Sequence, residues 1–156
     1  MNIQIADWKF LVDVEATYSH TLKNSSDHCL CGYCRNYYEC IDMVYPELRQ
    51  FLSQFGIVLE GPSELMPFEP TLMLACYRVH GKILAWGQEP LFADMLPISV
   101  GAGENGTFLL WVGEIPLPWG LDEPVEEVVS PANTSEFMDR MQQMWYLRHG
   151  EDFVVS

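Results

Sequence analysis

The sequence predicts an α+β fold: a mainly antiparallel sheet of about five strands, with a kinked helix pair and a C-terminal helix packed on it. Runs in which every second residue is apolar, typical of strands with one buried face, flank a segment whose apolar residues recur at helical spacing. Apolar residues make up 49% of the 156 residues, which is enough for a core and excludes a disordered chain. The length and the absence of an internal repeat predict one domain over residues 1–156.

The first half of the chain predicts one strand and then the helix pair. Residues 8–18 alternate between apolar and mostly polar side chains and predict a strand, and the polar segment 20–32 predicts a loop. In residues 33–55 the apolar positions are three and four apart, so we expect a helix with one apolar stripe that ends at Gly56. Pro46 interrupts the backbone but not the stripe, which predicts a kink or a second helix that starts there.

The second half predicts the rest of the sheet and a last helix. Residues 57–71 are rich in Gly and Pro and predict a connection. His80-Gly81 is short enough for a hairpin turn between the first two of the later strands. Residues 116–132 predict irregular structure, and residues 133–150 a capped amphipathic helix. The later strands are expected at Leu72–Val79, Lys82–Gly87, Phe92–Val100 and Thr107–Ile115.

Acidic residues dominate the charge of the chain. Twenty-two acids against eight bases give a net charge of −14, which argues against nucleic acid or an anionic membrane as a direct partner. Ten acids and no Lys or Arg lie between Lys82 and Arg140, so this segment favours a basic partner or a cation, although acidic surface also keeps a chain in solution. No apolar run reaches the roughly 20 residues that span a bilayer. Because residues 1–6 lack the features of a signal peptide, we expect a cytoplasmic protein.

Three cysteines within six residues, Cys29, Cys31 and Cys34, are the most chemically specific feature. Cys31-x-x-Cys34 has the spacing of a zinc knuckle, and we expect Cys29 as a third ligand and His28, or else His20, as the fourth. A second C-x-x-C pair, which is typical of zinc ribbons, is missing. Two interpretations therefore stay open: a structural zinc ion in the Cys29–Cys34 loop, or reduced thiols that pack the start of the helix.

A thiol-dependent enzyme that uses Cys34 is the alternative function. A C-x-x-C pair before a helix has the outline of a thioredoxin-type site, and the helix start favours a thiolate. The order of strands and helices around this pair is not the βαβ order expected of such a site. A cysteine hydrolase would need His80 as the base and Asp27 or Asn36 to orient it. By contrast, Cys76 lies in an apolar strand and is expected in the core.

Several segments resemble a family of small uncharacterised bacterial proteins. The family shares a CxCxxCRN(Y/F) segment, a following YPxL helix and a later stretch similar to GEIPLPW. In this chain the matching segments are residues 29–37, residues 45–48 followed by 55–57, and residues 113–119. The resemblance spans most of the chain and implies one compact domain, but it implies no activity, substrate or ligand.

We expect a binding or protein-interaction domain without catalytic activity. Arg35, Asn36 and Tyr38 are the candidate interaction residues, because Tyr38 lies off the apolar stripe beside a guanidinium and an amide. This combination is typical of protein interfaces, although ordinary packing at the rim of the core is the alternative. The apolar-rich composition is also compatible with a homodimer.

Overall fold

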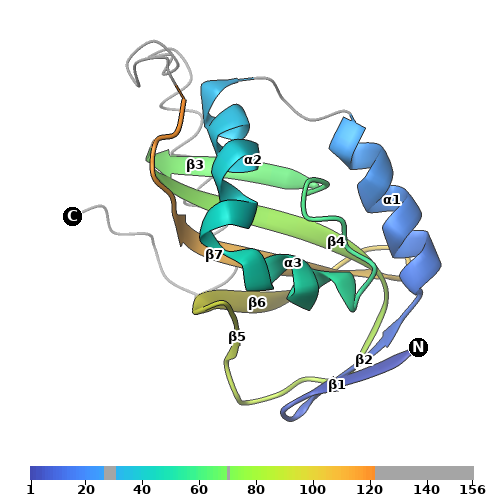
Figure 1. Cartoon of the computed structure of the whole chain (residues 1–156). Helices are drawn as coiled ribbons and strands as arrows, with labels where there is room; N and C mark the ends of the chain where they lie inside the picture. Colours follow the sequence, from blue (N-terminus) through green and yellow to red (C-terminus); the bar gives the residue numbers. More distant parts are fainter. Residues whose placement is uncertain (27–30, 70, 122–156) are drawn as a thin grey trace. The chain divides into compact units, whose positions relative to one another are not determined.

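The computed structural model describes residues 1–26, 31–69 and 71–121 (Figure 1). Residues 1–121 form one compact unit. The helix predicted for residues 133–150 lies outside the described residues, and the single domain over residues 1–156 stays a prediction. The elements are β1 (Asn2–Ile5), β2 (Trp8–Val12), α1 (Val14–Ser26), α2 (Gly32–Val44), α3 (Pro46–Ser53), β3 (Glu64–Glu69), β4 (Leu72–Ala85), β5 (Leu91–Ala93), β6 (Leu96–Ala102) and β7 (Thr107–Pro116).

The long strand β4 organises an antiparallel sheet of seven strands. The order is β1-β2-β4-β7-β6-β5, and β3 also pairs with β4. β7 pairs with residues 72–80 of β4, whereas β3 pairs with residues 72–76 and β2 with residues 81–85 along the other edge. The α+β class and the antiparallel sheet are confirmed, with seven strands instead of about five.

β4 runs straight through the predicted hairpin turn at His80-Gly81, so that prediction is wrong. The glycine serves a different purpose, because Gly81 has a φ of 154° and faces the backbone of β2. A Cβ atom there would lie 2.0 Å from the carbonyl oxygen of Leu11. Glycine is thus required for the close approach of β2 and not for a change of direction.

The predicted strand over residues 92–100 is in fact the hairpin of β5 and β6. Asp94 and Met95 form its turn, both with positive φ, 50° and 67°. Neither residue is the Gly or Asn that usually indicates such a turn. The Asp94 carboxylate accepts a hydrogen bond from the Glu47 amide at 3.0 Å, so the turn also caps the start of α3.

The predicted strand over residues 8–18 ends early, because α1 begins at Val14. Asp13 starts the helix: its carboxylate accepts a hydrogen bond from the Ala16 amide at 3.0 Å, as at a typical N-cap. The buried residues of α1 are Thr17 and Thr21, not the apolar residues on which the prediction rested. α1 also occupies residues 20–26, which had been predicted as a loop.

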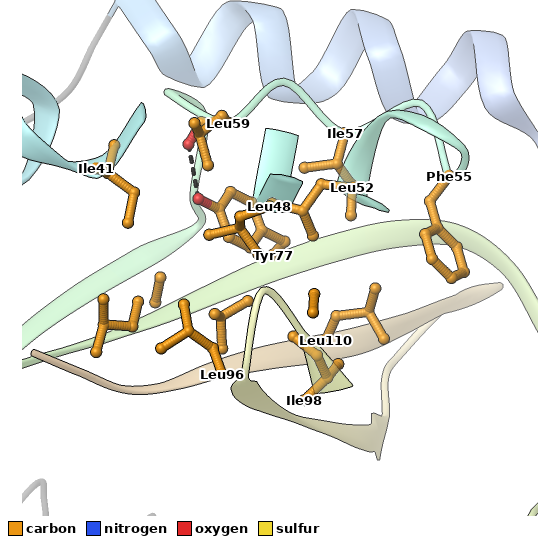
Figure 2. Packing of buried hydrophobic residues seen from close by; sticks show 14 of the residues in the cluster. Ile41, Leu48, Leu52, Phe55, Ile57, Leu59, Tyr77, Leu96, Ile98 and Leu110 are labelled. Atoms are coloured by element: carbon orange, nitrogen blue, oxygen red, sulfur yellow. Dashed lines mark hydrogen bonds between the residues drawn. The ribbon is translucent and has the colours of Figure 1, made fainter. Parts of the chain in front are cut away.

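The helix pair is confirmed as α2 and α3, with Pro46 as the first residue of α3. Both helices cross one face of the sheet in Figure 1, and the buried stripe packs against residues of β4, β6 and β7 as Figure 2 shows. Within this core the Tyr77 hydroxyl donates to the Leu59 carbonyl at 2.6 Å and lies 2.8 Å from the Tyr37 hydroxyl. In the described ranges, no helix is both long and apolar enough to cross a membrane.

Two strands had no counterpart in the predictions. β3 lies inside residues 57–71, which were expected to be a connection, and it pairs with only one neighbour. The register shifts between Pro67 and Glu69, where proline lacks the amide that the ladder requires. β1 forms the first edge of the sheet, paired with β2 alone.

Candidate functional site

Two of the predicted zinc ligands, Cys31 and Cys34, lie at the start of α2. Cys31 directly precedes the helix and is exposed, and Cys34 lies in its first turn and is buried. Cys29 and His28 lie outside the described residues, so the complete set of ligands is not tested. Among the residues that are described, no three His, Cys, Asp or Glu side chains are grouped as metal ligands. The zinc site therefore stays a prediction.

The backbone at the start of α2 favours negative charge. Cys31 occupies the N-cap position with an extended backbone, φ −65° and ψ 161°, and its side chain does not cap the helix. The Arg35 amide donates to the Cys31 carbonyl at 2.9 Å as the first helical hydrogen bond. The amides of residues 32–34 precede it and have no acceptor within the helix. These amides would stabilise a thiolate at Cys31 or Cys34, whether or not it binds a metal.

Asn36 is buried, with 1% of its surface exposed, and it holds the segment of residues 116–120 against α2. Its side-chain amide donates to the Pro118 carbonyl at 3.0 Å and accepts from the Gly120 amide at 2.7 Å. Cys40, one turn further on, has its sulfur 3.6 Å from both the Asn36 Oδ1 and the Pro118 carbonyl oxygen. A predicted interaction residue therefore points into the molecule and joins two distant parts of the chain.

Further contacts strengthen this junction. The Tyr45 hydroxyl donates to the Pro116 carbonyl at 2.6 Å, and the Tyr33 ring meets the Trp119 ring nearly edge to face at 6.4 Å. A Cβ atom on Gly120 would lie 2.8 Å from the Cys40 sulfur. The segments that carry the family resemblance thus contact each other: the CRNY helix start and YPxL turn on one side, the GEIPLPW stretch on the other.

Arg35 and Tyr38, the other predicted interaction residues, are half-buried. The Tyr38 ring packs edge to face on the buried Tyr37 ring, with 5.3 Å between the ring centroids. Both residues also have interactions of their own, so neither is a free surface group. The structure brings Arg35, Asn36 and Tyr38 together on one turn of α2, but it gives them mainly internal contacts.

The remaining thiols of the described chain are poor nucleophiles. Burial raises the pKa of Cys76 to about 12, with a smaller contribution from nearby Glu64. Burial also raises the pKa of Cys40. The expectation that Cys76 lies in the core is confirmed. For the hydrolase alternative, Asn36 uses both groups of its amide on residues 118 and 120, so it does not orient a catalytic histidine.

A surface formed by β1, β2 and the second half of β4 has no counterpart among the predicted sites. Phe10 and Ile83 pair across the strands and point toward the core. The residues on the other side of these strands form what we call the outward face, on which Leu11 is 40% exposed and Leu84 54%. The register shift between Lys9 and Phe10 places Trp86 on the core side instead, where its ring lies 5.8 Å from that of Trp8. The outward face comprises Asn2, Gln4, Lys9, Leu11, Lys82 and Leu84.

No family model matches the chain, and no curated protein or solved structure matches it either.

Proposed function

We propose that the chain is a protein-binding domain and that the outward face is its contact surface. The observation that carries this proposal is the exposure of Leu11 and Leu84 on one face of a sheet, where Leu11 pairs with Lys82. Single scattered exposed apolar residues are ordinary, but neighbouring ones flanked by polar and charged residues are typical of an interface. Burial of one such leucine stabilises a complex by about 1.5–3 kcal/mol.

The charge of the outward face selects an acidic partner. Lys9 and Lys82 lie on it, and its other strand positions are apolar or uncharged, such as Asn2 and Gln4. The chain as a whole carries a charge of −14, so two copies repel each other. A segment with acidic and apolar residues matches both features of the face and is attracted to it at long range.

Contacts with the turn between β1 and β2 hold the segment after β4 in place before any partner binds. The Asp7 carboxylate accepts hydrogen bonds from the amides of Gln88 at 2.6 Å and Glu89 at 3.2 Å. The Trp8 indole donates to the Glu89 carbonyl at 2.7 Å, and its ring lies 5.8 Å from that of Trp86. A surface fixed in this way loses little conformational entropy on binding, which favours affinity.

A structural zinc ion at His28, Cys29, Cys31 and Cys34 is part of the same proposal. It would fix the loop that enters α2 and stabilise the fold without acting on a substrate. The uncapped helix start supports thiolate ligands at this place. Elemental analysis of untagged protein should find about one zinc per chain, and a chelator should release the thiols and lower the melting temperature. Absence of metal together with freely titrating thiols would overturn this part.

A peptide-display selection tests the binding surface. We expect peptides that combine acidic and apolar residues, with affinity that falls as salt increases. Leu84→Ala should weaken binding by about 2 kcal/mol, roughly thirtyfold, as expected when a leucine that is buried in the complex is removed. Met95→Ser is the matched control, because Met95 is 92% exposed in the turn between β5 and β6, away from this face.

Two outcomes would contradict the proposal. Selected peptides that bind Leu84→Ala as tightly as the unaltered chain would exclude the outward face as the contact surface. A dimer of the unaltered chain that dissociates in Leu84→Ala would instead identify a second copy as the occupant. Light scattering on both variants distinguishes this case.

A further inference from the structure

Two histidines meet where α1 packs beside β4. The ring centroids of His20 on α1 and His80 on β4 are 5.3 Å apart, with the ring planes at 64°. Lys23 lies one turn after His20, and Arg78 lies two residues before His80 on the same side of the strand. We call these four residues the seam. Figure 1 shows α1 lying beside β4.

The positive groups of the seam have no acidic partner in the described part of the chain. Among the described residues, Arg49 forms ion pairs with Asp42 and Glu60. Neither Lys23 nor Arg78 forms an ion pair with a described residue. Arg78 donates to the Thr107 hydroxyl at 3.0 Å and leaves the rest of its guanidinium unused. The Nε2 atom of His80 is buried and has no hydrogen-bond partner. Buried polar atoms are rarely left in this state.

The electrostatic surroundings of His20 show the same excess of positive charge. Burial lowers the pKa of His20, and the positive charges of His80, Arg78 and Lys23 lower it further. In a chain with a net charge of −14, a group of cations that forms no ion pair with a carboxylate of the described residues is unusual. An anion bound among them would remove the repulsion and supply the missing partner for the buried nitrogen.

We propose that the seam is a binding site for a phosphate-class oxyanion. A guanidinium offers planar paired donors that match phosphate oxygens, and a lysine adds a point charge. The two imidazoles donate hydrogen bonds when protonated. A transition metal fits less well, because Arg78 and Lys23 would repel it and the described residues supply no third ligand.

The nearest carboxylates limit the size of the anion. Asp13 and Glu15, at the start of α1, line the same open cavity of about 660 Å³ as His80. Asp13 is engaged as the N-cap of the helix, and Glu64 lies on β3 opposite Cys76. Acidic groups on two sides would repel a long polyanion but leave room for a single phosphate group.

The experiment follows the histidine ring protons by NMR while inorganic phosphate replaces chloride at constant ionic strength. Saturation with phosphate should raise the pKa of His20 by about one unit, which corresponds to tenfold tighter binding of phosphate to the protonated ring. Lys23→Gln and Arg78→Gln should each weaken phosphate binding severalfold. Lys23 is exposed, so its variant keeps the fold even if Arg78→Gln does not.

Lys9→Gln is the matched control, since it removes the same charge at a position that pairs with Ala85, beyond the seam. An unchanged titration of His20 in phosphate would overturn the proposal. So would equal loss of binding in Lys9→Gln and Lys23→Gln, which would indicate general screening. Zinc that shifts both histidines when phosphate does not would identify a metal site instead. Phosphoserine in place of inorganic phosphate separates a phosphomonoester ligand from the free anion.

Discussion

Asn36→Ala is the sharpest test of how the described unit is held together. The substitution removes two hydrogen bonds, of 3.0 Å to the Pro118 carbonyl and 2.7 Å from the Gly120 amide. Each such bond contributes about 1 kcal/mol net, and a partner left buried without a substitute adds to the loss. Because Pro118 and Gly120 are partly accessible, water replaces some of these bonds. We expect destabilisation of about 2–3 kcal/mol and a melting temperature lower by roughly 5–10 °C.

Urea unfolding followed by circular dichroism measures this loss, and Trp119 reports on the segment itself. If Asn36 holds residues 116–120 in place, the Trp119 fluorescence of the Ala variant should shift before the helices unfold. Subtraction of the Trp119→Phe spectrum isolates that signal. Asn24→Ala is the control, because its amide makes one long bond of 3.4 Å to the Gly61 carbonyl and should cost less than about 1 kcal/mol. Equal losses in the two variants would refute the assigned role of Asn36.

Asn36→Asp refines the same test through pH. The carboxylate keeps an acceptor for Gly120 but faces the Pro118 carbonyl with an oxygen that cannot donate. Burial and this repulsion should raise the pKa of the new carboxyl in the folded state above the unfolded value of about 3.9. The folded state therefore binds the proton of this carboxyl more tightly than the unfolded chain does. The stability of this variant should therefore be greatest in acid and fall as pH rises through the folded pKa.

Three further predictions rest on single positions. Tyr77→Phe leaves two buried oxygens without a partner and should cost about 2–3 kcal/mol in urea unfolding; a loss under about 0.5 kcal/mol would contradict this. Cys76, with a pKa raised to about 12, should resist iodoacetamide at pH 8 while the exposed Cys31 reacts once a chelator is present, as mass spectrometry would show. Gly81→Ala should prevent or severely weaken folding, whereas Gly106→Ala, with open space around it and a φ of 75°, should cost only about 1–2 kcal/mol by circular dichroism.

Much of the fold could be predicted because its pattern is local. The stripe of α2 and α3 continues across Pro46, and β7 has the alternation of a half-buried strand. α1 was not predicted because its inward-facing residues, Thr17 and Thr21, are polar. Their hydroxyl groups serve as hydrogen-bond acceptors for backbone amides of neighbouring segments. The Thr17 hydroxyl accepts from the His80 amide at 2.9 Å and the Thr21 hydroxyl accepts from the Val58 amide at 3.0 Å. No periodicity of apolar residues reveals a helix held by hydroxyl groups.

The candidate sites were harder to predict because they depend on contacts between distant segments. Asn36 appeared to be a surface group, since nothing local indicates that Pro118 and Gly120 will need its amide. The outward face left a weak signal in β4, where the apolar Leu84 lies between Ile83 and Ala85. Such a run shows two apolar faces, and only the register with β2 decides which one is buried.

The second half of β4 connects the two proposed sites through charge. Arg78, His80 and Lys82 occupy alternate positions of β4, so they lie on the same side of the strand, and successive members lie about 7 Å apart. That spacing is shorter than the Debye length of about 8 Å at physiological ionic strength. A phosphate bound at the seam would therefore weaken the field at Lys82 and slow the approach of an acidic partner to the outward face. Lys9 is the other base on that face, so little positive charge remains to restore the field, and the two ligands should compete without touching.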